Sequence, residues 1–324
     1  TNQCNMFCKH CYREAGEKVR EELTTEEGKN LIDEIKKAGF RIMIFSGGEP
    51  LMREDIFELV GYASQVGLRP VFGTNGTLIT REVAKKLKNL GAMGMGISLD
   101  SLDPEKHDRF RGYPGGFEEA VRGMENCLAE KLPFQIHTTV MDWNKDEIEN
   151  ITDFAVEKGA VAHHIFFLVP TGRAINIEEE SLRAKEYEEI LTRIMLKQQK
   201  VPIEIKPTCA PQFMRIAKEM GMDLRFQRGC LAGTSYCIIS PKGEVQPCAY
   251  LNISIGNVRE TPFSQIWAES PVFKELRSLN YKGGCGRCKY KLACGGCRAR
   301  AAFYNNGDYM AEEPWCLYQG RTGY

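Results

Sequence analysis

Three cysteines near the start of the sequence have a spacing that suits a single metal centre. Cys4, Cys8 and Cys11 are separated by three and by two residues, so one short loop can direct all three thiolates to the same place. A tetrahedral zinc ion and a cubane iron–sulfur cluster each take four ligands. Because this loop offers only three, either a distant residue completes the site or one position stays open. An open position is where a bound metal does chemistry.

A glycine-rich turn follows the first predicted strand. Gly47 and Gly48 let the backbone come close to a ligand, and Glu49, which precedes Pro50, can accept hydrogen bonds from an ammonium group. Alone, this turn is typical of an ordinary strand-to-helix connection. Beside the cysteine loop, it resembles the GGEP motif of the radical S-adenosylmethionine (SAM) enzymes. That resemblance implies that the cysteine loop holds a 4Fe–4S cluster whose open iron binds SAM.

The same resemblance places further SAM contacts at the ends of later strands. Asn75 matches a residue near the ribose, Ser98 and Asp100 the segment that touches the carboxylate, and Arg111 the arginine that pairs with it. An arginine suits that task because its planar fork matches two carboxylate oxygens. From the residues alone, Asn75 can equally belong to a simple turn and Arg111 to a charged surface. The implied SAM-binding set is Gly47, Gly48, Glu49, Pro50, Asn75, Ser98, Asp100 and Arg111.

Eight cysteines in the last third of the chain form a second set. Their spacing resembles the SPASM extension of radical SAM enzymes, which carries two auxiliary 4Fe–4S clusters. The sequence departs from that pattern at Cys297, which follows Cys294 after two residues rather than three. The resemblance implies one auxiliary cluster on Cys230, Cys237, Cys248 and Cys297, and a second on Cys285, Cys288, Cys294 and Cys316.

The sequence has 13 cysteines, and other uses for them stay open. C-x2-C pairs also suit structural zinc, so the C-terminal set can be a zinc ribbon. A disulfide scaffold is less compatible with these spacings in a chain without a recognisable export signal. Of the two cysteines outside both sets, Cys127 is predicted to be a small core residue in a helix. Cys209 can face the substrate or be structural.

The elements that must position these residues are strands alternating with helices of about 10–15 residues, which predicts βαβ units and a parallel sheet. Five strands are expected at residues 41–45, 69–72, 93–99, 134–140 and 163–168, with a sixth upstream of Cys4. Functional loops gather at the carboxyl ends of such strands. We therefore expect an α/β fold: a partial (β/α)6 TIM-like barrel in residues 1–200, a bridging segment in 201–229, and a cysteine-rich SPASM domain in 230–324.

Composition argues against several classes of partner. The chain has 324 residues, with 43 Lys and Arg against 43 Asp and Glu, so bulk charge predicts no nucleic-acid partner and no anionic membrane surface. Its apolar runs are far too short to span a bilayer. Since no export signal is evident and iron–sulfur clusters are sensitive to oxygen, the expected location is a reducing cytoplasm.

A narrower resemblance rests on four short segments. Residues 1–4 (TNQC), 167–173 (FLVPTGR), 207–213 (PTCAPQF) and 229–233 (GCLAG) are similar to NirJ-type proteins and their haem-synthase relatives. That group removes or oxidises propionate or acetate side chains of iron porphyrinoids on the way to haem d1 or haem. The resemblance implies a porphyrinoid substrate and a reductant such as ferredoxin or flavodoxin. Candidate clamps for the substrate carboxylates are Arg173, Arg215, Arg225 and Arg228, and His137 can line the cavity.

The favoured hypothesis is a radical SAM enzyme that cleaves SAM reductively to a 5′-deoxyadenosyl radical, which takes a hydrogen atom from an unactivated carbon. One alternative is a SPASM-type maturase that modifies a peptide or protein side chain, although no dedicated peptide-recognition domain is evident. Another is a non-catalytic module, which would bind zinc or would hold clusters for electron transfer without binding SAM.

Overall fold

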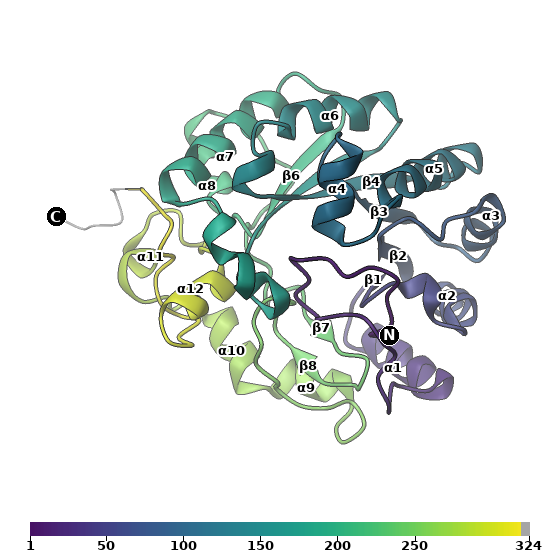
Figure 1. The fold of residues 1–324 in the computed structure, drawn as a ribbon. Helices are drawn as coiled ribbons and strands as arrows, with labels where there is room; N and C mark the ends of the chain where they lie inside the picture. Colours follow the sequence, from purple (N-terminus) through teal and green to yellow (C-terminus); the bar gives the residue numbers. More distant parts are fainter. Residues whose placement is uncertain (319–324) are drawn as a thin grey trace.

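The computed structural model describes residues 1–318 of the chain. Its centre is a six-stranded parallel sheet whose strands lie side by side in chain order, from β1 to β6. Figure 1 shows this sheet curling into an open half-barrel. The strands are β1 (Ile42–Phe45), β2 (Arg69–Thr74), β3 (Gly94–Ser98), β4 (Phe134–Val140), β5 (Ala162–Phe167) and β6 (Glu204–Thr208).

Helices connect the strands and cover the outer face of the sheet (Figure 1). In the first helix, Thr24 and Glu27 form a capping box, and Leu31, Ile32 and Ile35 make the buried stripe. The helices are α1 (Thr25–Lys37), α2 (Ile56–Gln65), α3 (Arg81–Asn89), α4 (Pro104–Arg111), α5 (Gly116–Ala129), α6 (Ile148–Glu157), α7 (Ala184–Gln198) and α8 (Phe213–Glu219). Short 3₁₀ segments are η1 (Pro50–Met52), η2 (Asp142–Asn144) and η3 (Gly172–Glu180).

The two faces of the sheet have different chemistry, as the alternation of residues along β4 shows. Phe134 and Ile136 are buried in the main core with residues of α5 and α6. Gln135, His137 and Thr139 point to the opposite, concave face and are only half-buried. The helix-covered face therefore supplies stability, and the concave face carries polar groups.

The sixth strand, β6, lies where prolines predict a bridging segment. It pairs in parallel with β5, placing Ile165 opposite Pro207. A proline cannot donate to a β-ladder, and β6 tolerates Pro207 because it is the last strand of the sheet. The predicted barrel boundary at residue 200 is therefore wrong, since the sheet continues to Thr208. The strand expected ahead of Cys4 does not form in residues 1–3, where Gln3 makes an isolated bridge to Gly16.

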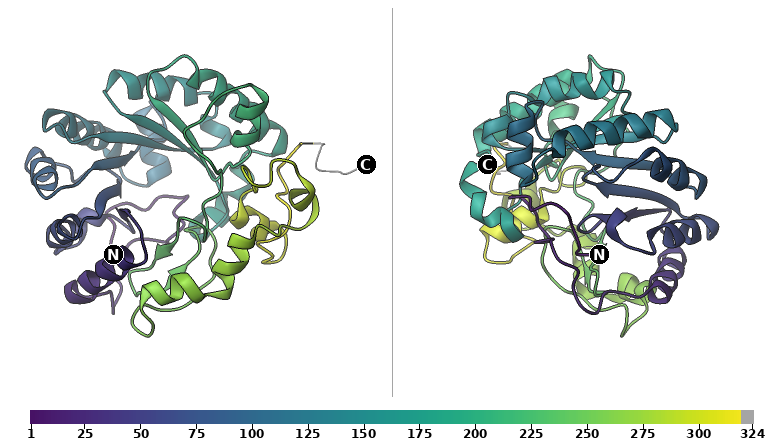
Figure 2. Two further views of the ribbon diagram at one scale, coloured as in Figure 1. Left: turned by 180° about the vertical axis from the view of Figure 1, so that it is seen from behind. Right: turned by 45° about the vertical axis from the view of Figure 1, so that its right-hand side comes forward.

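The C-terminal region closes the open side of the half-barrel. Phe263 and Phe273 join the main core with α1 and α2, whereas Ala293 and Trp315 pack with α7 and α8. Both views in Figure 2 show this region between the start of the barrel and its last helices. Its elements are β7 (Ile238–Ile239), β8 (Val245–Gln246), α9 (Phe263–Glu269), α10 (Pro271–Ser278), α11 (Gly283–Arg287) and α12 (Arg298–Tyr304).

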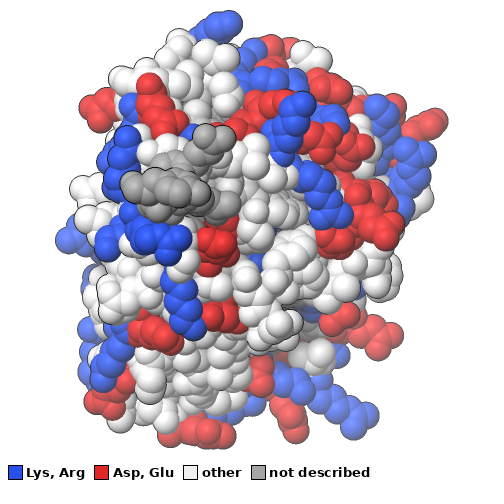
Figure 3. Space-filling view, turned by 90° about the vertical axis from the view of Figure 1, so that its left-hand side faces the viewer, with Lys and Arg blue, Asp and Glu red and all other residues white. Residues whose placement is uncertain are grey.

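The surface carries both signs of charge. On the face in Figure 3, basic and acidic side chains are mixed, and neither sign forms a continuous field. This mixture agrees with the equal numbers of acidic and basic residues in the chain. None of the helices in residues 1–318 combines the length and the apolar character that crossing a bilayer requires.

Candidate functional site

Arg173, on η3, holds the N-terminal cysteine loop in place. Its Nε donates to the carbonyl oxygen of Cys8 (2.8 Å), and its Nη1 donates to that of Ala15 (2.9 Å). Burial, together with the charges of Cys8 and Cys11, raises the pKa of the Cys4 thiol to about 11. The structure therefore brings the three predicted thiols together, and it uses Arg173 to support them.

The three thiols match the number of protein ligands of a cubane iron–sulfur cluster that keeps one iron open. In a cubane cluster each thiolate binds a different iron, so the thiols stand further apart than they do around zinc. The histidine of the loop, His10, stacks on Phe110 with 4.3 Å between ring centroids. Three thiols on one loop therefore suit a cluster that keeps one iron open.

Gly47 and Gly48 allow the start of the chain to lie directly on the glycine-rich turn. A Cβ at Gly47 would overlap the carbonyl oxygen of Thr1, and a Cβ at Gly48 would overlap that of Gln3. The backbone N–H of Gly48 donates to Thr1 (2.9 Å), and that of Glu49 donates to Gln3 (2.8 Å). The segment that leads into the cysteine loop therefore lies against the backbone of these glycines, where a close approach was expected.

Glu49 organises the site from inside the protein. It is fully buried, and its carboxylate accepts hydrogen bonds from the hydroxyl of Thr74 (2.8 Å), the N–H of Asn75 (2.9 Å) and the N–H of Leu51 (3.0 Å). Burial raises the pKa of Glu49 to about 6, although these donors oppose the shift. Glu49 therefore joins the end of β2 to the turn that begins at the buried Pro50.

Asn75 and Ser98 lie at the carboxyl ends of β2 and β3, as expected. The amide nitrogen of Asn75 donates to the side-chain oxygen of Asn5 (2.7 Å), which lies within the cysteine loop. The hydroxyl of Ser98 donates to the carbonyl oxygen of Thr74 (3.3 Å). Both residues therefore border the loop, and Asn75 is bonded to it directly.

Asp100 and Arg111 form a buried ion pair beside the cysteine loop. Arg111 Nε lies 2.7 Å from Asp100 Oδ2, and the N–H of Thr139 donates to Asp100 Oδ1 (2.7 Å). Arg111 Nη1 lies 3.9 Å from the sulfur of Cys8. Burial is the largest single effect and opposes ionisation of Asp100, but the charges of Arg111, His10 and His107 together outweigh it and lower the pKa of the carboxyl. Arg111 is thus a buried charge at the thiolates and not a surface residue.

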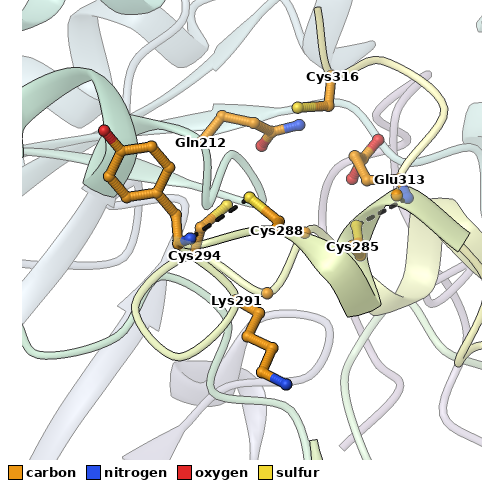
Figure 4. A pocket seen from close by; sticks show the side chains of 11 residues that line it. Gln212, Cys285, Cys288, Lys291, Cys294, Glu313 and Cys316 are labelled. Carbon is orange, nitrogen blue, oxygen red and sulfur yellow. Dashed lines mark hydrogen bonds between the residues drawn. The ribbon is translucent and has the colours of Figure 1, made fainter. Parts of the chain in front are cut away.

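One predicted auxiliary set lines a single hollow in the C-terminal region. Figure 4 shows the sulfurs of its four cysteines turned toward a common space next to Gln212 and Glu313. The hollow has about 310 Å³ of empty volume, part of it open to solvent. Backbone N–H groups donate to two of the sulfurs, from Glu313 to Cys285 (3.3 Å) and from Tyr290 to Cys288 (3.4 Å). The cysteines are Cys285, Cys288, Cys294 and Cys316.

Three cysteines of the other predicted auxiliary set lie close together. Burial raises the pKa of the Cys248 thiol, and the charges of Cys230 and Cys297 raise it further, so these three lie close together. Cys237 is absent from this group and packs against the main core. Cys209, which is outside the predicted set, lies beside Cys297. The remaining cysteine, Cys127 on α5, is fully buried in the main core, which confirms the predicted role.

The predicted carboxylate clamps are mostly engaged elsewhere. Arg215 is buried and paired with two glutamates, and the side chain of Arg225 is 88% exposed. Arg228 donates to the hydroxyl of Tyr281 (3.1 Å). Nη2 of Arg173 and Nε of Arg215 are both buried and have no hydrogen-bond partner within residues 1–318.

Three buried charged residues that lie beside the auxiliary cysteines were not predicted from the sequence. Arg298 Nη2 lies 3.8 Å from the sulfur of Cys285. Arg300 is fully buried and lies 3.4 Å from the carboxylate of Glu313, which also accepts from the N–H of Cys297 (2.8 Å). The one signal in the sequence was position, since both arginines follow Cys297 closely.

Comparisons with known proteins agree with this geometry. The model of the radical SAM superfamily matches residues 1–155, and that of an iron–sulfur cluster-binding domain, SPASM, matches residues 230–297. An AdoMet-dependent heme synthase from Methanosarcina barkeri is 44% identical over 98% of this chain and 95% of its own length. The chain belongs to the radical SAM superfamily. A second AdoMet-dependent heme synthase, from Nitratidesulfovibrio vulgaris, is 46% identical over 99% of this chain and 91% of its own length.

More distant relatives of this radical SAM protein have other functions. A pre-heme d1 synthase from Dinoroseobacter shibae is 28% identical over 100% of this chain and 86% of its own length. The mycofactocin maturase MftC from Mycolicibacterium smegmatis is 31% identical over 98% and 81%. In fold, the chain resembles Streptococcus suis SuiB bound to its precursor peptide SuiA, with a TM-score of 0.79 at 17% identity, covering 97% of this chain and 74% of that one.

The packing at Gly48 gives a first prediction. Gly48→Ala pushes the new Cβ into backbone that cannot move without the loop, so we expect a loss of about 1–3 kcal/mol in unfolding free energy and of about four irons per chain. Gly16→Ala is the matched control, because a Cβ there meets nothing within 4 Å. Urea unfolding and iron analysis of both variants check this. Equal iron content in the two variants would contradict it.

The Asp100–Arg111 pair gives a second prediction. Asp100→Asn leaves the buried guanidinium without its carboxylate, so the unfolding free energy should fall by about 3–5 kcal/mol. Asp223→Asn, at an exposed position, should change it by no more than about 0.5 kcal/mol. Urea unfolding under anaerobic conditions measures both. A similar small effect of the two substitutions would show that the ion pair does not stabilise the site.

Proposed function

We propose that this chain is a haem synthase of the radical SAM type, which modifies propionate or acetate side chains of an iron porphyrinoid. The observation that carries the proposal is the similarity to AdoMet-dependent heme synthases, at 44–46% identity over nearly the whole chain. Such similarity extends beyond the cysteine motifs that radical SAM proteins share. The three groups of cysteines supply thiol ligands for the iron–sulfur clusters that such a reaction needs.

The proposed reaction has a simple atom balance. When bound, the N-terminal cluster and SAM supply a 5′-deoxyadenosyl radical that takes one hydrogen atom from carbon. A propionate that loses a hydrogen atom from the carbon next to the ring, then CO2 and one electron, becomes a vinyl group. An external one-electron acceptor has to take the electron. Within the site, the protein contributes position and the exclusion of water.

The concave face of the barrel offers groups suited to such a substrate. Ser98, His137, His164 and Lys206 lie opposite one another on four neighbouring strands, so they form one row across the sheet. The rings of His137 and His164 are stacked with 5.3 Å between centroids, and Phe166 lies 5.1 Å from His137. Flat rings beside a lysine ammonium suit a flat molecule with carboxylates. We therefore place the porphyrinoid against this row.

A second candidate substrate is a peptide side chain. The similarity to MftC, named as a mycofactocin maturase, favours it at 31% identity. The likeness to SuiB adds nothing to this choice, because identity of 17% supports the fold alone. Because the sequence identity to the heme synthases is higher, we prefer the porphyrinoid as the candidate substrate.

Two further parts of the proposal concern the surroundings of the protein. A reductant such as ferredoxin or flavodoxin has to deliver the electron that starts each cycle. Buried thiolates that hold oxygen-sensitive clusters need a reducing compartment, so we propose a cytoplasmic location.

The test is anaerobic turnover of the iron-loaded protein with SAM, a strong reductant and an iron porphyrin that bears four propionates. We expect 5′-deoxyadenosine together with a porphyrin that has lost carboxyl groups. Cys8→Ala should give no 5′-deoxyadenosine above background while keeping the C-terminal clusters. Fully loaded protein that forms no 5′-deoxyadenosine would contradict radical SAM activity, and turnover of a peptide alone would favour the second candidate.

A further inference from the structure

Cys209 lies at the junction between the barrel and the C-terminal region, directly after β6. Its backbone adopts a φ of +60°, a left-handed conformation that costs about 1–2 kcal/mol in a residue other than glycine. The hydroxyl of Tyr187 lies 3.3 Å from its carbonyl oxygen. Such a conformation persists where the surrounding structure requires it, and it often marks a functional position.

The side chain of Cys209 belongs to a group of four cysteines. Cys209 and Cys248 pack against one small apolar cluster that contains Cys297 and Leu251. The thiol of Cys209 lies beside that of Cys297 and near that of Cys248. Cys297 also lies near Cys230, and Cys230 lies near Cys248. These contacts link all four thiols, which come from four distant parts of the sequence.

The strand register directs Cys237 away from this group. In the β7–β8 hairpin, Ile238 pairs with Gln246 and Ile239 pairs with Val245. If this register is continued by two residues beyond Ile238, Tyr236 stands opposite Cys248. Side chains alternate along a strand, so Cys237 points to the face opposite that of Cys248.

The surroundings of Cys237 agree with this direction. The side chain packs against the main core together with Ile239 and Val245, which share its face of the hairpin. Among charged groups, Arg277 is the neighbour that acts on its thiol. Cys237 therefore behaves as a small apolar residue of the core.

The polar surroundings of the four-cysteine group suit bound thiolates. Arg300 is fully buried, and its charge acts on both Cys209 and Cys297. The nearby backbone N–H groups of Arg298, Tyr250 and Arg300 favour the charged forms of Cys230, Cys248 and Cys297, respectively. A buried cation and several N–H donors are the contacts that stabilise a buried, negatively charged cluster.

We propose that Cys209 is the fourth protein ligand of the first auxiliary cluster, with Cys230, Cys248 and Cys297, and that Cys237 is not a ligand. Each iron of this cluster then has a cysteine ligand, and none is left open for substrate. The cluster would serve electron transfer and would tie the end of the barrel sheet to the C-terminal region. This inference rests on the iron–sulfur content of the chain and not on the identity of its substrate.

The experiment compares Cys209→Ala with its matched control Cys237→Ala. Both are made in a protein that also carries Cys4→Ala, Cys8→Ala and Cys11→Ala, so that the auxiliary clusters alone remain. We expect Cys237→Ala to keep about eight irons per chain and the parent EPR spectrum after reduction. Cys209→Ala should lose about four irons, or should give a three-iron signal on oxidation. The reverse pattern, or unchanged iron and spectra in Cys209→Ala, would overturn the proposal.

A second variant decides the question if Cys209→Ala does not fold. Cys209→Ser keeps the size of the side chain and offers an oxygen ligand, so the g-values and midpoint potential of one auxiliary cluster should shift. Unchanged values in this variant would overturn the proposal, as would a Cys209–Cys297 disulfide found by mass spectrometry of the iron-loaded protein. Because no substrate is present in these measurements, failure here leaves the proposed reaction untouched.

Discussion

The structure depends on placing negatively charged sulfur inside a protein. Burial alone raises the pKa of the thiols, as it does for Cys4, and so opposes the thiolate form that binds iron. A buried arginine near each group of thiols opposes this effect, because its positive charge favours the thiolate form. These arginines are Arg111 near Cys8, Arg298 near Cys285 and Arg300 near Cys297. A buried guanidinium is itself costly unless it is paired. The thiolates and the arginines therefore each lower the free-energy cost of burying the other.

The three groups form one connected system. Glu313 links the two auxiliary groups, because its carboxylate accepts from the N–H of Cys297 (2.8 Å) and its own N–H donates to Cys285 (3.3 Å). Between the N-terminal loop and the first auxiliary group, the rings of Tyr12 and Tyr250 lie 5.2 Å apart. The C-terminal region that closes the half-barrel thus also aligns redox sites, and this suits a reaction that has to remove an electron.

Much of this could be predicted from the sequence, because cysteine spacing and strand periodicity are local signals. The first five strands are close to their predicted places. The sequence could not reveal β6, because the edge position that tolerates Pro207 is a property of the whole sheet. The proposed exchange of Cys237 for Cys209 could not be read from the sequence either, since it is argued from strand register and a left-handed backbone. Nor could the sequence show that Arg173 and Glu49 bond to other parts of the chain itself, because those partners lie far away along the sequence. Their predicted contacts with substrate and SAM stay predictions.

The central claim is that one cluster keeps an iron open for SAM and that the two auxiliary clusters are closed by cysteine. EPR spectra of the reduced, fully loaded protein before and after addition of SAM test it most directly. The account predicts that SAM shifts the signal of one cluster and leaves the other two unchanged. A spectrum that does not respond to SAM, or a shift in an auxiliary signal, would contradict it.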